Sequence, residues 1–364
     1  MSQVAPDTHQ IDDEARPGAW AADTSLDVIE VVGPDAVGYL QGQLSQNVSG
    51  LAVGAWAPSL LLEPQGKMCA WMRVHRAADD TVHLVVDAGF GTVVEQRLRR
   101  FWLRTKAELS TRFNVPTLAV RAWPDGLAVP AAEDVTPGGA DPILVAPAPW
   151  PTHPGFDLIG DGATLPDDVV RLEGDAGRQA LERARVASGV PAMGTEIGPD
   201  TIPAAARVVE ASVDFTKGCY TGQELVARID SRGNVTPTRL VLLTGDGEVP
   251  QRDAALSVDG TDRASVTTAV PAAGEGGQVW DTCIAPWTRR QNSPLADGQP
   301  VHAVDRARTR AEPPVGLSDG HRVTDVSHRA VIQTRRRRRT SLDETLNHHR
   351  RCRYRRAFRR LGTT

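Results

Sequence analysis

The hydrophobic patterning of this 364-residue chain stops at about Val270, and this break limits what the chain can fold into. Residues 1–270 carry 22 basic and 36 acidic side chains, and their short apolar runs follow strand or helix spacing. Residues 271–364 carry 19 basic and 9 acidic side chains and follow neither spacing. The length suits two or three packed units, so we expect a globular acidic part followed by a different kind of sequence.

The composition excludes several classes of protein. No apolar run is long enough to cross a membrane as a helix. Residues 1–25 are acidic and lack an apolar stretch, which predicts a disordered tail rather than a signal or transit peptide. The four cysteines are widely spaced, which favours a reducing cytoplasm over a disulfide framework or a zinc site. They are Cys69, Cys219, Cys283 and Cys352.

The first part mixes strands and helices, which predicts an α+β fold rather than alternating parallel units. A hairpin is expected between 255–258 and 264–270, because Asp259 and Gly260 form a favoured turn pair. Period-2 or short apolar runs predict strands at 27–32, 58–62, 68–74, 82–87, 118–122, 142–145, 225–229 and 240–243. Apolar residues at helical spacing predict helices over 34–44, 90–101 and 175–187.

The segment 214–228, Asp-Phe-Thr-Lys-Gly-Cys-Tyr-Thr-Gly-Gln-Glu-Leu-Val-Ala-Arg, gathers the most chemistry in the chain. Its two glycines allow positive φ or close approach of a ligand to the backbone. Its Lys and Arg offer cations, its Gln and Glu offer hydrogen bonds, and its cysteine is a soft nucleophile. Such a loop could bind a polar, partly aromatic ligand with a carboxylate tail, or it could be an ordinary turn with a buried thiol.

The eight residues from Lys217 to Glu224 resemble the full signature of the YgfZ family, K-G-C-Y-x-G-Q-E, and residues 226–228 continue it. Similar segments elsewhere extend the resemblance over roughly residues 26–270. It implies the fold of the glycine-cleavage T-protein (GcvT), with mixed α/β lobes forming a folate-binding domain over 26–240. A small C-terminal β-barrel would start at 241–270 and remain incomplete.

The family resemblance also implies function. It makes Cys219 the functional thiol of a tetrahydrofolate-binding protein that helps to make or repair iron–sulfur client enzymes, including some that modify tRNA. A lone thiolate offers at most one ligand to a cluster, so we expect no stably bound metal or cluster. Arg228 is a weaker candidate for a folate carboxylate. The residues expected to shape the cofactor-binding loop are Lys217, Gly218, Tyr220, Gly222, Gln223, Glu224 and Arg228.

The alternative is a folate-dependent aminomethyl or one-carbon transferase. In the T-protein, an aspartate on an N-terminal strand attends the folate nitrogen, but Ala70 and Trp71 fall at that place here, and neither is an acid or a base. A transferase would therefore need another group, with Glu196 or Asp214 as candidates. In the segment 203–206, Pro203 is followed only by alanines, where many relatives have Gln or Glu, which removes a polar contact.

The last part of the chain has two interpretations. We expect residues 271–364 to be a disordered tail or an out-of-frame translation, and an unfinished barrel would lower the stability of the fold. A functional alternative is that arginine runs such as 335–339 bind nucleic acid non-specifically. Aromatic residues that could stack on bases are few, so sequence-specific reading is not expected.

Overall fold

The computed structural model describes residues 18–124, 127–132, 135, 138, 142–165, 169–246, 248–258, 261–271, 279–288, 300–304 and 330–331. The chain divides into two units, 1–333 and 334–364, and all the described residues belong to the first. No helix among these described residues is long and apolar enough to cross a membrane.

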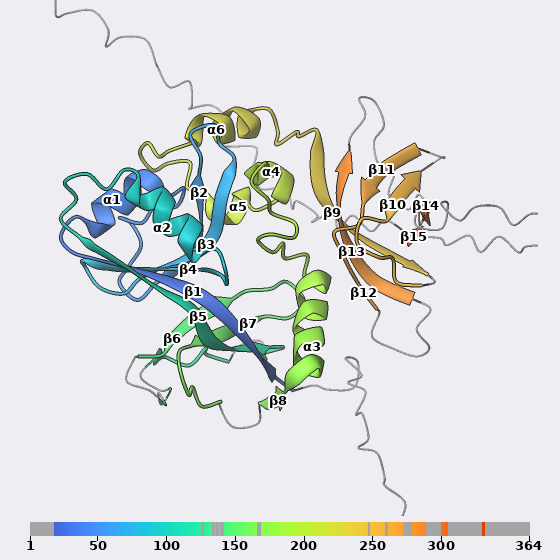
Figure 1. Cartoon of the computed structure of the whole chain (residues 1–364), viewed down its shortest axis with the longest axis horizontal. Coiled ribbons are helices and arrows are strands. Elements are labelled where there is room, and N and C mark those ends of the chain that lie inside the picture. The colour runs from blue at the N-terminus through green and yellow to red at the C-terminus, as the bar shows by residue number, and fades with distance from the viewer. Residues whose placement is uncertain are drawn as a thin grey trace, which may run out of the picture. The chain divides into compact units, whose positions relative to one another are not determined.

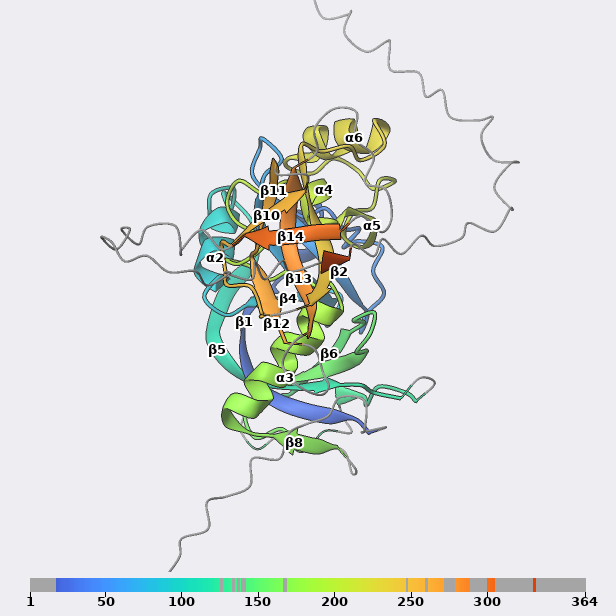
Figure 2. The same ribbon diagram turned by 90° about the vertical axis from the view of Figure 1, so that its right-hand side faces the viewer.

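The described elements fall into two sheets with helices packed on or between them (Figures 1 and 2). In chain order they are β1 (Trp20–Val32), α1 (Ala36–Gln43), β2 (Trp56–Leu62), β3 (Met68–Arg76), β4 (Thr81–Asp87), α2 (Gly91–Arg99), β5 (Glu108–Arg121), β6 (Leu144–Ala148), β7 (Gly155–Ile159), β8 (Val170–Leu172), α3 (Gly174–Ala187), α4 (Pro203–Ala206), α5 (Val209–Ser212), α6 (Gln223–Ser231), β9 (Thr238–Asp246), β10 (Ala255–Val258), β11 (Thr261–Ser265), β12 (Thr268–Val270), β13 (Val279–Thr288), β14 (Pro300–Val304) and β15 (Ala330–Val331).

The first sheet has the strand order β2-β3-β4-β1-β5-β7-β6, with neighbouring strands antiparallel. Strand β1 lies at its centre and also pairs in parallel with the short β8. Its main core lies under α1 and α2, where Leu40 and Leu98 are fully buried with Leu60 and Leu84 of the sheet. The strands expected at 58–62, 68–74 and 82–87 are confirmed within two residues, and the strand expected at 27–32 is the second half of the longer β1.

Asp27 in β1 is a buried carboxylate that joins three parts of this sheet. It accepts backbone N–H hydrogen bonds from Gly89 (2.9 Å) and Gly91 (2.8 Å), which precede or begin α2. It accepts a third from Asn114 of β5 (2.8 Å), where the β1–β5 register shifts. A buried irregular backbone must satisfy its polar groups, and Asp27 does so here.

The second sheet has the strand order β11-β10-β14-β15-β9-β13-β12. The expected hairpin is confirmed in part: β10 and β11 pair antiparallel with Val258 opposite Thr261, but the second strand lies at 261–265 rather than 264–270, and residues 268–270 form β12, which pairs with β13. Helix α3 contacts β1 of the first sheet and β12 and β13 of the second. Figure 1 shows α3 between the two sheets, where it positions the site described below.

Several expectations differ from the structure. Residues 20–25, expected within a disordered tail at 1–25, form the first part of β1 because they pair with β5. Residues 225–229 lie in helix α6, not in a strand, because Gly222 and Gln223 begin a helix and a short apolar run fits either period. Strands also continue beyond residue 271: β13 pairs with β9 and β12, and β14 pairs with β10. Pairing between segments so far apart cannot be read from local periodicity. The five-arginine run at 335–339 lies outside the described residues.

We expect Asp27→Ala to lower the free energy of unfolding by about 3 kcal/mol, because it leaves three backbone N–H groups without an acceptor. Urea unfolding followed by circular dichroism measures this loss. Asp23→Ala is the matched control, because Asp23 is a half-exposed partner of Arg171 and should change stability by less than about 0.5 kcal/mol. Equal losses in the two variants would contradict the role given to Asp27.

Candidate functional site

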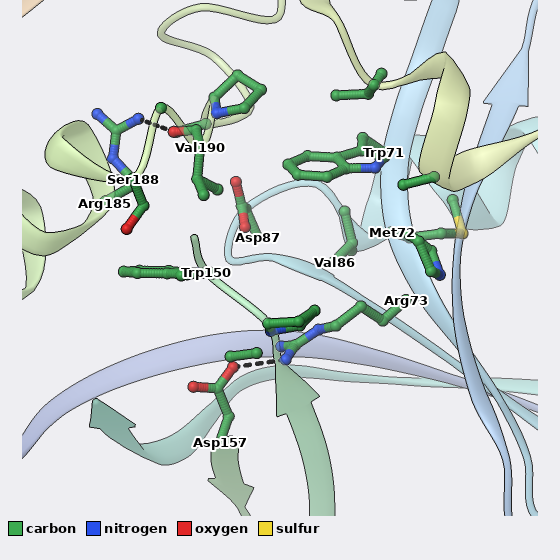
Figure 3. Close-up of a pocket in the computed structure, with 18 of the residues that line it drawn as sticks. Trp71, Met72, Arg73, Val86, Asp87, Trp150, Asp157, Arg185, Ser188 and Val190 are labelled. Carbon is green, nitrogen blue, oxygen red and sulfur yellow. Dashed lines mark hydrogen bonds and ion pairs between the residues drawn. The ribbon is translucent and has the colours of Figure 1, made fainter. Parts of the chain in front are cut away.

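A cavity of about 880 Å³ lies between the first sheet, α3 and strand β9 of the second sheet (Figure 3). Its volume is within the range of sites that bind drug-sized ligands, roughly 300–1,000 Å³. Its lining comes from β1, β2, β3, β4, β5, β6, β7, α3, α4, α5 and β9, together with the segments 149–151, 188–192 and 207–208. Chain segments far apart in the sequence therefore build one site.

Tryptophan rings form much of the apolar wall. Trp71 of β3 is fixed by a hydrogen bond from its indole Nε1 to Ser212 Oγ (3.0 Å). The guanidinium of Arg121 lies over the ring of Trp150, 3.9 Å from the ring centroid. Trp56 adds a third indole from β2. Because Trp71 and Trp150 have specific partners, these flat surfaces are ready to receive a planar ligand.

A buried ion network forms the floor of the cavity. Asp157 of β7 lies between Arg73 of β3 (2.7 Å) and Arg121 of β5 (2.8 Å). Burial opposes ionisation of Asp157, but Arg121 and Arg73 outweigh it and hold the pKa of this carboxyl below its usual value. Arg73 also donates to Pro147 O (3.3 Å). Both arginines are thus committed to protein partners.

A second carboxyl, Asp87 at the end of β4, lines the cavity without an ion-pair contact (Figure 3). Its Oδ2 accepts one hydrogen bond from the backbone N–H of Met193 (2.9 Å). Burial raises the pKa of Asp87, and the nearby Asp157 charge adds to the rise. The Met193 hydrogen bond and the charges of Arg73 and Arg185 oppose it. Asp87 is therefore a perturbed acid in an aromatic cavity, as expected of functional groups.

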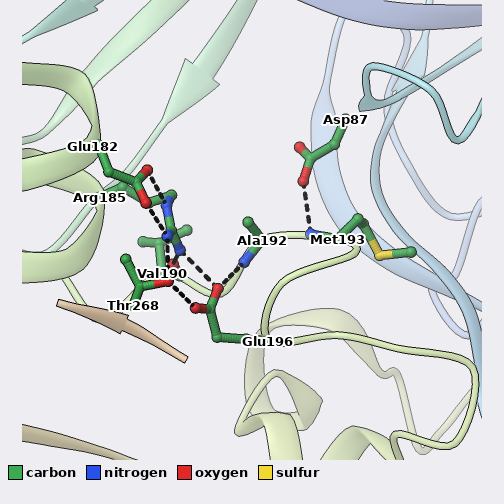
Figure 4. A network of polar contacts seen from close by, with 8 residues as sticks. All are labelled: Asp87, Glu182, Arg185, Val190, Ala192, Met193, Glu196 and Thr268. Atoms are coloured by element: carbon green, nitrogen blue, oxygen red, sulfur yellow. Dashed lines mark hydrogen bonds and ion pairs between the residues drawn. The ribbon is translucent and has the colours of Figure 1, made fainter. Parts of the chain in front are cut away.

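A polar network joins α3 to the second sheet beside this cavity (Figure 4). Arg185 donates to Glu182 (2.6 Å) and to Glu196 Oε2 (2.9 Å). Glu196 also accepts from the Ala192 N–H (2.9 Å), and its Oε1 accepts from Thr268 Oγ1 of β12 (2.6 Å). These contacts place α3 and β12 in a fixed relation, so they support the cavity wall.

Neither carboxyl that the sequence offered for transferase chemistry lines the cavity. Both oxygens of Glu196 are engaged in the network just described. Asp214 accepts hydrogen bonds from Thr216 and from the Lys217 N–H, which is the geometry of a turn, and the Thr216 contacts lower its pKa. The acid that does line the cavity is Asp87.

Lys217 fastens the predicted cofactor loop to α1. Its ammonium donates to the carbonyls of Gln41 (2.6 Å), Gln46 (2.9 Å) and Leu44 at the C-terminal end of that helix. Three acceptors use the whole donor capacity of an ammonium, and a cation is favourable at a helix C-terminus. Burial lowers the pKa of Lys217 to about 8. Its contacts are those of an anchor rather than of a ligand-binding group.

The second glycine of the motif allows the backbone of this loop to pack closely against the turn between β2 and β3. Gly222 has φ of 83°, and a Cβ there would lie 2.6 Å from Glu63 O. Gly66 in the turn has φ of 80°, and its Cβ would lie 2.6 Å from Leu225 Cβ. Both positions therefore require glycine for packing. Gly218 has no such neighbour.

The other motif residues are also held within the protein. Tyr220 is buried, which raises the pKa of its hydroxyl to about 12, and its backbone N–H donates to Gln223 Oε1 (3.2 Å). Glu224 and Arg228 form an exposed ion pair on α6 (2.5 Å). None of the residues 214–228 lines the cavity. Their expected roles in cofactor binding remain predictions, and their contacts favour a structural role.

Cys219 is exposed on this anchored loop. Lys217 precedes it and Tyr220 follows it, and both are tied to the body of the protein. The loop thus presents a thiol to the solvent from a fixed backbone. The structure separates two features that the sequence suggested to be one site: the cavity and the Cys219 loop.

This chain is similar in sequence to several curated proteins. No protein-family model matches it. It is 28% identical over 220 residues to the tRNA-modifying protein YgfZ of Klebsiella pneumoniae, covering 56% of this chain and 64% of that protein. A YgfZ of Sodalis glossinidius is 25% identical over 293 residues, covering 76% and 86%. The mitochondrial iron–sulfur cluster assembly factor IBA57 homolog of Chaetomium globosum is 26% identical over 249 residues, covering 61% and 56%.

The chain is therefore similar in sequence to YgfZ proteins, and its fold is GcvT-like. Its match to the first relative spans just under two thirds of that protein's length. Among solved structures, the glycine cleavage system aminomethyltransferase T of Bartonella henselae matches with a TM-score of 0.66 and 18% identity, covering 88% of this chain and 86% of that one. The expected α+β, GcvT-like fold is therefore confirmed.

The motif at 217–224 is recognisable in the sequence, but the groups that line the cavity are not. Trp71 was noted only as a non-acidic replacement, whereas the structure shows it as a cavity wall. Asp87 ends a predicted strand just before Ala-Gly, and nothing local indicates that its carboxylate accepts a hydrogen bond from the Met193 N–H. Trp150 lies in a Pro-rich segment with weak periodicity. These residues come together only through the sheet order.

We expect Cys219 to react with iodoacetamide at least about tenfold faster than Cys69. Cys219 is exposed, whereas Cys69 is half-buried and its thiol donates to Glu63 (2.9 Å). Burial and this carboxylate raise the pKa of Cys69 to about 12, which leaves little thiolate at neutral pH. Pulse labelling of the native protein, read peptide by peptide by mass spectrometry, measures both rates.

Glu63→Gln is the matched control for this experiment. It removes a charge that disfavours the Cys69 thiolate, so labelling of Cys69 should accelerate while that of Cys219 stays unchanged. Equal labelling of the two cysteines in the native protein would show that the loop does not present Cys219 as described.

Proposed function

We propose that this chain binds tetrahydrofolate in its cavity and acts as a cytoplasmic accessory protein for iron–sulfur enzymes, including enzymes that modify tRNA. The names of its relatives, a tRNA-modifying protein and an iron–sulfur cluster assembly factor, support the process. The GcvT-like fold and the shape of the cavity support the ligand. Tetrahydrofolate, when bound, supplies a carrier for one-carbon units.

The observation that carries the proposal is the half-buried Asp87 carboxyl in a cavity walled by Trp71 and Trp150. A reduced pterin is a flat heterocycle with several N–H donors and needs stacking surfaces together with an acceptor. The indoles offer the surfaces, and Asp87 offers an acceptor that no cation of the protein already contacts. The volume of about 880 Å³ also has room for more than the pterin ring.

The Cys219 loop is proposed to act separately, at the surface. A lone exposed thiol can contact the cluster or thiol groups of a client without holding a cluster itself. Because Lys217 and Gly222 fix the loop against α1 and the β2–β3 turn, the thiol is preorganised for such a contact. Folate and client would then meet different faces of the protein.

A folate-dependent one-carbon transferase is the second candidate, and Asp87 is the observation that favours it. A carboxyl whose pKa is raised by burial is a candidate to exchange a proton with a bound ligand. One-carbon transfer that is lost in Asp87→Asn but kept in Cys219→Ala would favour this candidate. Loss of iron–sulfur enzyme activity in a Cys219→Ala strain, without any measurable transfer, would favour the accessory role.

We expect the purified protein to bind tetrahydrofolate in anaerobic calorimetric titration and Asp87→Asn to weaken binding at least about tenfold, as loss of a charged acceptor does. Asp161→Asn is the matched control, because Asp161 is exposed and outside the cavity. If the native protein does not bind the ligand, or Asp87→Asn binds equally well, the proposed role of the cavity is wrong.

The raised pKa of Asp87 also predicts a pH dependence. Without ligand, the folded protein keeps this proton at pH values where the unfolded chain has lost it. The free energy of unfolding should therefore fall as the pH rises from the ordinary carboxyl pKa toward the raised value. Arg73, Arg185 and Asp157 are the charged groups that face Asp87 and set this range.

Asp87→Asn has no carboxyl group to ionise at this position, so it should not lose this stability as the pH rises. We expect it to be more stable than the native protein at neutral pH, with a difference that narrows in acid, as urea unfolding at several pH values would measure. Tetrahydrofolate binding by the native protein should tighten as the pH rises through the same range, and that by Asp87→Asn should not. A variant less stable than the native protein at neutral pH would contradict the prediction.

A further inference from the structure

The cavity contains more cations than its acids neutralise. Four arginines line it, together with three carboxyl groups, those of Asp87, Asp157 and Glu182. Arg73 and Arg121 share Asp157, and Arg185 is paired with Glu182 and Glu196. The fourth arginine, Arg207, has no hydrogen-bond or ion-pair partner for its side chain within the described part of the chain. The four lining arginines are Arg73, Arg121, Arg185 and Arg207.

Arg207 also has an unusual backbone. It follows α4 as its C-cap residue with φ of 62° and ψ of 28°, which is the left-handed region. Glycine is the usual residue there, because a side chain costs free energy in that conformation. Its neighbours Ala206 and Val208 are buried, so the surrounding structure imposes the conformation. An arginine in such a conformation that also lines a cavity is a candidate for a functional side chain.

The side chain stands where the cavity meets solvent, since Arg207 is exposed and also lines the cavity. The inner arginines could take an anion only by giving up buried carboxylates, which is costly. A guanidinium at the mouth can bind a carboxylate through two parallel hydrogen bonds while both groups remain partly hydrated. A ligand with a flat ring inside the cavity and an anionic tail at its mouth would match this placement of neutralised inner arginines and an outer one that the described residues leave unpaired.

We propose that Arg207 binds the carboxylate tail of the cavity's ligand, so that the cavity discriminates tailed folates from tail-less pterins. This inference rests on the proposed function and names the part of the ligand that leaves the cavity. Sequence reasoning gave the carboxylate role to Arg228, but that residue is paired with Glu224 and lies outside the cavity lining. Arg207 follows directly after the alanines where many relatives have a polar residue, and it restores a polar contact there.

The test compares two ligands that differ in the tail. Tetrahydrofolate and 6-methyltetrahydropterin are titrated anaerobically into the native protein and into Arg207→Gln. We expect the substitution to weaken tetrahydrofolate binding about three- to tenfold, as loss of a partly exposed charge-assisted contact does. The affinity for 6-methyltetrahydropterin should stay within about twofold of that of the native protein. Raising the salt concentration should reduce the preference of the native protein for tetrahydrofolate.

Arg232→Gln is the matched control. Arg232 is an exposed helix C-cap arginine like Arg207, but it has φ of −100° and does not line the cavity. Its substitution should leave both affinities unchanged. Arg207→Gly is a second variant that tests the backbone argument: it should raise the urea midpoint of unfolding, since the strain is relieved, and still weaken tetrahydrofolate binding. If this variant binds tetrahydrofolate more weakly but is more stable to urea, the loss of affinity is not caused by misfolding.

The outcomes separate this inference from the proposed function. If the native protein binds tetrahydrofolate and Arg207→Gln binds it equally well, or loses both ligands to the same extent, the tail contact is wrong and the cavity assignment stands. If the native protein binds neither ligand, both the proposed function and this inference are wrong.

Discussion

The buried carboxylate of Asp157 is the contact on which the cavity depends. It holds Arg73 of β3 and Arg121 of β5 at the floor, and Arg121 in turn supports the ring of Trp150. Removing one member of such a network leaves a buried charge without a partner, which typically costs about 3–5 kcal/mol. The same network commits both inner arginines, so the ligand must find its polar contacts at Asp87 and at the mouth.

The functional region contains residues in energetically unfavourable states. Asp87 is half-buried beside a single backbone donor, and Arg207 occupies a conformation that suits glycine. Cys219 is left exposed although free cysteine is usually buried. Local violations of this kind are expected where selection acts on binding rather than on stability. In contrast, Asp27 and Lys217 satisfy backbone groups and stabilise the scaffold around them.

The sequence predicted the local elements better than the site. The strands at 58–62 and 68–74 and the helix over 175–187 were predictable because their apolar spacing is local. Helix α6 was misread because five apolar-rich residues fit a strand or a helix. Strand β13 was missed because its partners β9 and β12 are supplied by tertiary pairing. The family signature located the Cys219 loop, but its residues gave no indication that Lys217 would serve as an anchor. The cavity could not be predicted, because its wall and acid come from strands that meet only in the folded sheet.

The central claim is that ligand and thiol occupy separate places, the ligand between Trp71 and Trp150 and the thiol on an anchored surface loop. A crystal structure of the protein with tetrahydrofolate tests this claim most directly. The account predicts the pterin inside the cavity in contact with Asp87, with Cys219 free of the ligand. A pterin bound against residues 214–228, with the cavity empty, would contradict it.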